Sequence, residues 1–210
     1  GKMRVVAGSG ASRDLRQVEL NRHVEMMSRF VERTNDEVSL TITLILRSAS
    51  SGPAKALVAM KDELAGARIR AQAILAKLDP AEELRALYAS LSELAPAAKA
   101  PELMRWACNP RLLDAHEQVT YGTAMCWTGD AMRRDADRRN ALALFDETAS
   151  DRVRLGHLAF TAIWSASTLV PERHLAGSAT SKLSGSHEAE PDAPMTILRR
   201  GFQGWPLIRH

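Results

Sequence analysis

Cysteine and long apolar runs are scarce in this sequence, and each scarcity excludes a class of protein. Two cysteines, Cys108 and Cys126, are too few for the disulfide framework of a small secreted domain. We expect both thiols to be reduced and buried. No apolar run reaches the roughly 18 residues that cross a bilayer, and the N-terminus makes a poor signal peptide. The expectation is a cytoplasmic protein with no membrane span.

Motifs for nucleotides and metals are missing as well. The sequence contains no Walker loop, no Gly-x-Gly-x-x-Gly and no Gly-x-Ser-x-Gly elbow. Its histidines form no pair or Cys/His cluster with the spacing of zinc ligands. Basic residues number 28 against 25 acidic ones, a balance that permits contact with nucleic acid without requiring it. We therefore expect neither a metal nor a cofactor.

The first half of the chain shows alternating helix and strand patterns. Apolar residues recur at helical spacing in some segments, and β-branched runs mark others. The patterns predict these elements in order: helix 13–33, strand 38–46, helix 54–65, strand 69–75, helix 79–91 and a short helix 103–107. A strand, a helix of about three turns and a second strand form a parallel pair with a right-handed crossover.

The second half begins with a hairpin. The segment from Leu112 to Asp130 is typical of strand, turn and strand, and a further strand is expected within residues 138–145. A last helix begins at Ser150 or Asp151. Its apolar face is predicted to consist of Val153, Leu155, Leu158, Ala159, Ile163 and Trp164.

Composition changes near the C-terminus. Residues 176–194 are rich in Gly, Ser, Ala, Pro and Glu, which is typical of a flexible, disordered linker. An aromatic and basic segment follows, and it either docks on a protein partner or folds back onto the domain. The contact residues of this segment would be Arg199, Arg200, Phe202 and Trp205. The expected organisation is a helical segment 1–37, an α/β domain 38–170, a linker 171–196 and a C-terminal segment 197–210.

The hairpin carries the residues of most interest. His116 is followed by Gln118, and a Gly-containing turn with Arg133 comes after the second strand. These residues and the order of elements over about residues 38–170 resemble one half-unit of the phospholipase D-like superfamily. The motif of that family is His-x-Lys, four residues, Asp, and then a Gly-Ser-x-x-Asn turn. His116 matches the histidine, whereas Gln118 replaces the lysine, Thr123 the aspartate and Arg133 the asparagine.

The resemblance implies a mixed β-sheet flanked by helices, and it implies phosphodiester chemistry that this chain has partly lost. In active members one histidine attacks phosphorus and a second, from another half-unit, protonates the leaving group. A chain with one motif would therefore act as a homodimer. The lysines of the family neutralise phosphate oxygens in the transition state. A charge pair at about 4 Å is worth roughly 4 kcal/mol at an effective dielectric near 20, or several powers of ten in rate.

Three interpretations follow from these residues. The leading one is a non-catalytic phospholipase D-like binding or assembly module, because Gln118 can donate a hydrogen bond to phosphate but carries no charge. The second is a weak phosphodiesterase in which His116 is the nucleophile and Gln118, Arg133 and Arg134 hold phosphate. The third is a nucleic-acid-binding regulator that uses the basic residues at 133–139 and 199–209.

A purely structural role for His116 also has to be weighed, because a lone histidine near a strand start is more often structural than catalytic. Asp114 would share the face of His116 and orient its imidazole ring. Glu117 is expected to face the opposite side of the sheet, since successive strand residues alternate.

Overall fold

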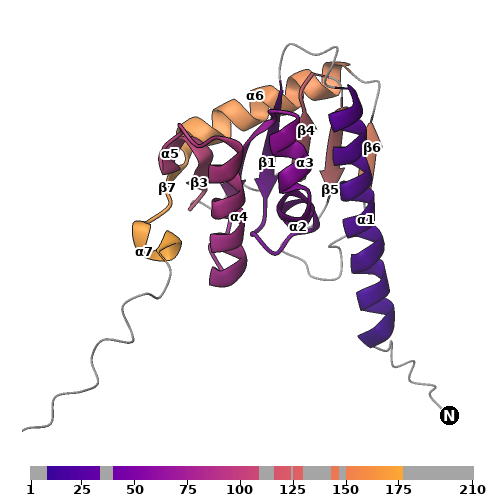
Figure 1. Cartoon of the computed structure of the whole chain (residues 1–210), viewed down its shortest axis with the longest axis horizontal. Helices are drawn as coiled ribbons and strands as arrows, with labels where there is room; N and C mark the ends of the chain where they lie inside the picture. The colour runs from indigo at the N-terminus through magenta and orange to yellow at the C-terminus, as the bar shows by residue number, and fades with distance from the viewer. Residues whose placement is uncertain are drawn as a thin grey trace, which may run out of the picture. The chain divides into compact units, whose positions relative to one another are not determined.

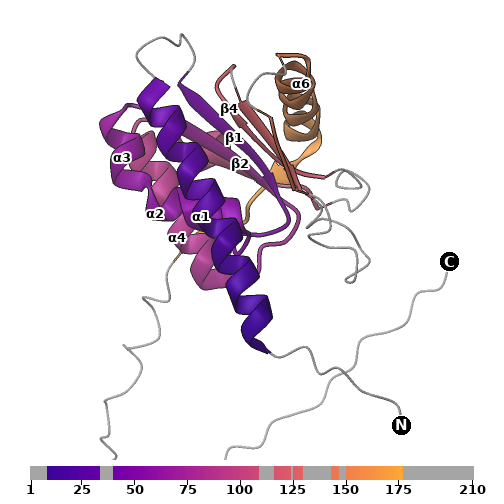
Figure 2. The ribbon, with the colours of Figure 1, turned by 90° about the vertical axis from the view of Figure 1, so that its right-hand side faces the viewer.

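The computed structural model describes residues 9–33, 40–108, 116–123, 125–129, 143–146 and 150–176. In these residues seven strands form one mixed sheet in the order β6-β5-β4-β1-β2-β3-β7, with helices on both faces (Figures 1 and 2). The predicted α/β fold with a mixed sheet flanked by helices is thereby confirmed. The elements are α1 (Ser9–Arg33), β1 (Thr41–Leu46), α2 (Gly52–Ala59), α3 (Lys61–Gly66), β2 (Arg70–Leu75), α4 (Ala81–Leu94), α5 (Ala100–Leu103), β3 (Met104–Trp106), β4 (Glu117–Tyr121), β5 (Met125–Gly129), β6 (Ala143–Asp146), α6 (Ser150–Ala166), β7 (Thr168–Leu169) and α7 (Glu172–Leu175).

The sheet is built around β1. This strand runs parallel to β2, with Ile42 opposite Ala71, and β2 runs parallel to β3. Helices α2 and α3 make the crossover that a parallel pair needs. On its other side β1 pairs with β4, which is antiparallel. Five of the six residues of β1 are buried, as expected for a central strand covered on both faces.

Helices α1 to α4 cover one face of the sheet (Figure 2). Alternate strand residues point into this layer, among them Leu44 of β1 and Tyr121 of β4. They pack against α1, where Met27 and Phe30 are completely buried. Burying one such side chain contributes about 1.5–3 kcal/mol to the free energy of folding. The N-terminal helix is therefore part of the same hydrophobic core as the strands.

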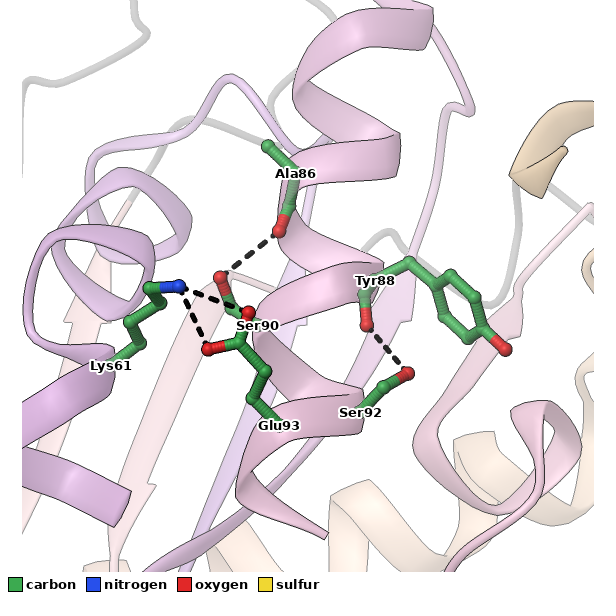
Figure 3. A network of polar contacts seen from close by, with 6 residues as sticks. All are labelled: Lys61, Ala86, Tyr88, Ser90, Ser92 and Glu93. Carbon is green, nitrogen blue, oxygen red and sulfur yellow. Dashed lines mark hydrogen bonds and ion pairs between the residues drawn. The ribbon is translucent and has the colours of Figure 1, made fainter. Parts of the chain in front are cut away.

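Polar contacts join α3 to α4 and bond two serines of α4 to the backbone of the same helix (Figure 3). Lys61 of α3 donates to both carboxylate oxygens of Glu93 on α4, at 2.9 and 2.7 Å. Ser90 and Ser92 donate to carbonyls one turn earlier in α4. An exposed ion pair contributes little to stability, so α4 is held mainly by its buried leucines. These are Leu84, Leu87, Leu91 and Leu94.

Helix α6 lies against the opposite face of the sheet (Figure 2). The predicted apolar face of this helix is wrong in part, because Leu155 and Leu158 are 59% and 60% exposed. The buried side of α6 consists of Val153, Gly156, Phe160 and Ile163. Glycine has no side chain, so the spacing of apolar side chains does not identify a glycine as a buried position of the helix. The close contact at Gly156 sets the rotation of the helix.

Two further predictions about secondary structure need correction. Most of the segment predicted as a short helix 103–107 is the strand β3, which pairs with β2 from Ala73 to Leu75, and only Leu103 is helical, as the last residue of α5. The predicted helix 54–65 is divided at Met60, whose φ of −98° and ψ of 10° leave the helical region.

Both cysteines are free thiols, but only Cys126 is buried, whereas Cys108 is exposed.

The described fold continues to Ala176, through β7 and α7, past the boundary expected at residue 170. Contacts divide the chain into one unit of Gly1–Gly177 and another of Ser178–His210. The expected C-terminal docking residues lie outside the described residues. Within the described ranges, no helix has both the length and the apolar character needed to cross a membrane.

Candidate functional site

The candidate site lies at the edge of the sheet where the parallel strands β1, β2 and β3 end. In open α/β sheets, ligands bind most often at this carboxyl edge. Here Arg47 follows β1, Lys77 follows β2 and Cys108 follows β3. The backbone NH of Lys77 donates to the carbonyl of Arg47 at 2.8 Å, so these two segments run side by side.

His116 lies at the same edge, directly before β4, and is exposed. The antiparallel register of β4 and β1 puts Gln118 opposite Ile45. The ladder ends at this pair, and both His116 and Arg47 lie beyond it. Gln118 and Thr120 share the face of the sheet that α6 covers, because strand residues alternate.

Gln118 packs beneath α6. Its Nε2 atom is buried and has no hydrogen-bond partner in the part of the chain that the structure describes. A Cβ atom placed on Gly156 would lie only 2.7 Å from this nitrogen and 2.7 Å from Cγ2 of Thr120. The closest surroundings of the amide are therefore the backbone of α6 and the side chain of Thr120. In this position Gln118 presents no positive charge to the edge of the sheet.

Glu117 points to the opposite face of the sheet, as expected, and is 1% exposed. Its Oε1 atom accepts hydrogen bonds from the backbone NH of Arg47, at 2.8 Å, and from Oγ of Ser51, at 2.6 Å. Burial raises the pKa of Glu117, and these two hydrogen bonds oppose the rise. The carboxyl group ties the start of the hairpin to the loop between β1 and α2. We call this contact the Glu117 latch.

Two more titratable residues, both from α1, lie next to the latch. A Cβ atom on Gly52 would be 3.3 Å from Cδ2 of His23 and 3.5 Å from Cδ of Glu19. The His23 ring is completely buried and meets the Trp127 ring edge to face, with centroids 4.5 Å apart. Burial lowers the pKa of His23 to about 4 and raises the pKa of Glu19. Burial therefore favours the neutral form of all three groups.

Sequence reasoning did not identify this cluster as part of the site. A signal for His23 exists, since it precedes Met26, Met27 and Phe30 at helical spacing and so lies on the buried face of α1. The partner of Glu117 has no such local signal, because Ser51 comes 66 residues earlier in the sequence.

A metal site and a small-molecule pocket are the other kinds of site to consider. Among residues 9–176, insofar as they are described, no group of three or more His, Cys, Asp or Glu side chains is arranged to hold a metal ion. A hollow of about 220 Å³ lies at the opposite edge, where β1 and β2 begin. It is smaller than the roughly 300 Å³ at which ligand pockets usually start. It is lined by Thr41, Arg70, Ala71, Gln72, Ala95, Ala98, Glu102 and Leu103.

The remaining predicted site residues are not brought together with His116 by the described structure. Thr123 is exposed in the turn after β4, at the far end of that strand from His116. The other residues lie outside the described ranges, namely Asp114, Arg133, Arg134, Arg199, Arg200, Phe202 and Trp205. Compared with known proteins, the chain matches no family model, no curated protein and no solved structure.

Proposed function

We propose that this chain is a non-catalytic, phospholipase D-like binding or assembly module. The observation that carries the proposal is the position of Gln118. Its amide nitrogen is buried beneath α6, against Gly156, two residues from the exposed His116. The hairpin keeps a histidine at the edge of the sheet, while the neighbouring position that would supply positive charge is neutral and covered.

Phosphoryl transfer depends on cations that are placed where negative charge grows in the transition state. A neutral amide cannot supply that stabilisation, even when it reaches the phosphate. The end of the Gln118 side chain is buried, so a longer side chain at position 118 would have to displace atoms that cover it or take another path. Glu117, the other polar residue of the strand start, is engaged in the latch rather than in chemistry.

Assembly as a homodimer belongs to the proposal, because the phospholipase D-like half-unit that this chain resembles combines with a second half-unit. Helix α6 exposes Leu155 and Leu158 on its outer side, which offers apolar surface for contact with another protein. Light scattering coupled to size-exclusion chromatography measures the mass of the particle directly. A monomer at all accessible concentrations would remove assembly from the proposal.

Hydrolysis of bis(p-nitrophenyl) phosphate tests the absence of catalysis. We expect the wild type, His116→Ala and Gln118→Lys to show the same background rate. His174→Ala, a histidine of α7 away from the hairpin, is the matched control. A rate above background that is lost only in His116→Ala would overturn the proposal. That result would favour the weak phosphodiesterase, which the exposure of His116 supports.

A further inference from the structure

The hollow of about 220 Å³ at the edge where β1 and β2 begin is lined by three parts of the fold. The lining residues come from the starts of these two strands, from Ala95 and Ala98 after α4, and from Glu102 and Leu103 of α5. The NH of Ala98 donates to the carbonyl of Ala95 at 2.9 Å. Nε2 of Gln72 donates to the carbonyl of Glu102 at 2.8 Å. Hydrogen bonds therefore hold both the turn after α4 and the position of α5 beside β2.

Arg70 supplies the positive charge of the hollow. It is the first residue of β2, and it is exposed. Its backbone NH donates to the carbonyl of Leu40 at 2.8 Å, which fixes the start of the strand beside β1. Its side chain forms neither an ion pair nor a hydrogen bond with the described residues. The planar guanidinium group can therefore donate two parallel hydrogen bonds to a carboxylate from outside the chain.

Negative charge comes from Glu102 and from the end of α4. Glu102 is exposed, and its carboxylate has no hydrogen-bond or ion-pair partner within the described ranges. Helix α4 ends at Leu94, directly before the lining residue Ala95, and its last turn contains no basic residue. The C-terminal end of a helix carries a partial negative charge and favours a cation. An ammonium group on this side of the hollow is therefore attracted by two sources of negative charge.

The two charged side chains line one hollow without neutralising each other. No ion pair joins Arg70 to Glu102, so a ligand with both a carboxylate and an ammonium group can engage each of them. The volume of about 220 Å³ suits a ligand below drug size. Much of the remaining lining is aliphatic, namely Ala71, Ala95, Ala98 and Leu103.

We propose that this hollow binds a free α-amino acid with a small aliphatic side chain, such as alanine. Arg70 holds the carboxylate, Glu102 and the end of α4 hold the ammonium group, and the side chain of the ligand lies against the aliphatic lining. The site goes beyond the proposed function and does not depend on it, because the hollow lies at the opposite edge of the sheet from His116.

Titration of the full chain with L-alanine, followed by NMR, tests the proposal. We expect saturable shifts of the backbone amides of Ala71 and Ala98, which line the hollow. Acetate and ethylamine each carry only one of the two charges and should bind more weakly than alanine. Arg70→Gln and Glu102→Gln should each weaken the affinity for alanine about tenfold. This is the lower end of what a charge-assisted hydrogen bond supplies, because both side chains are exposed to solvent.

Arg22→Gln and Glu82→Gln are the matched controls. They remove the same charges from exposed residues that do not line the hollow, and they should leave the affinity unchanged. The test substitutions should leave the fold intact, because the bond from Gln72 goes to the backbone of Glu102 and not to its side chain. Circular dichroism of each variant checks the fold.

The absence of saturable shifts with alanine, or wild-type affinity in Arg70→Gln, would overturn the proposal. Acetate that binds as tightly as alanine, with no effect of Glu102→Gln, would also overturn it, because the hollow would then be a simple anion site. Arg70→Lys keeps the charge but loses the fork, so it should bind alanine with intermediate affinity. This variant keeps the test decisive if Arg70→Gln does not fold.

Discussion

Gln118 and Gly156, 38 residues apart in the sequence, meet so closely that a methyl group on the glycine would come within 2.7 Å of the Gln118 amide nitrogen. This contact sets the distance between α6 and the sheet. It also means that Gln118, two residues after His116, is covered by a helix.

Gly156→Ala should destabilise the protein. The new methyl group meets the stiff, β-branched Thr120 as well as Gln118, so α6 must shift. Overpacking of this kind costs about 1–3 kcal/mol, offset by up to about 1 kcal/mol of helix propensity. Urea unfolding measures the difference. Gly66→Ala is the control, because nothing lies within 4 Å of the Cβ position at Gly66. Equal stability of the wild type and Gly156→Ala would show that α6 is not seated on this contact.

Tyr121→Phe should leave stability unchanged or raise it. The Tyr121 hydroxyl is completely buried and finds no hydrogen-bond partner in the described part of the molecule. An unsatisfied buried polar group costs about 1–3 kcal/mol, so its removal relieves a penalty while the ring keeps its packing against Phe30. The midpoint of urea unfolding is the readout, and Tyr88→Phe on the half-exposed side of α4 is the control. A clear loss of stability in Tyr121→Phe alone would mean that the hydroxyl is bonded.

The buried cluster around the Glu117 latch should make the stability of the protein depend on pH in two opposite ways. The pKa of His23 is lowered from 6.5 to about 4 in the folded state. Its contribution is therefore present above about pH 6.5 and is lost as pH falls toward 4. The pKa of Glu117 is raised above 4.5, so its contribution is present at low pH and is lost as pH rises through its folded pKa. The two contributions to stability therefore change in opposite directions with pH, and they offset each other where both groups titrate.

Glu117→Gln separates the two limbs of this pH profile. The amide oxygen of glutamine can still accept from the NH of Arg47 and from Ser51, but the residue has no charge to bury. Its stability relative to the wild type should therefore increase as the pH rises above the ordinary glutamate pKa of 4.5, and it should level off once the carboxyl group of the folded wild type ionises. A constant difference across that range would show that Glu117 does not titrate there.

Much of the fold was predictable because its main elements have strong local patterns. The β-branched run of β1 and the apolar spacing of α1 and α4 each predict the correct element. β3 was missed, since three residues are too short to show a period and their conformation depends on pairing with Ala73 to Leu75 of β2. The rotation of α6 was missed for a related reason, because its tightest contact is made by a residue without a side chain.

The candidate site was predictable only in part. His116 stands out in the sequence, and its place directly before β4 agrees with the hairpin pattern. Its position near the end of β1 depends on the insertion of β4 beside β1, which no short stretch of sequence encodes. The latch depends in the same way on Ser51 and Glu117, which only the tertiary fold brings together.

The place of β1 between β2 and β4 has a consequence for synthesis on the ribosome. β2 follows β1 closely and can pair with it early, but β4 is translated only after α4, α5 and β3. Until then the other side of an apolar central strand presents unpaired backbone groups, which are a template for pairing with strands of other chains. A nascent chain that ends before residue 117 is therefore the form most prone to aggregate. We expect chaperones to bind this form in preference to the complete chain.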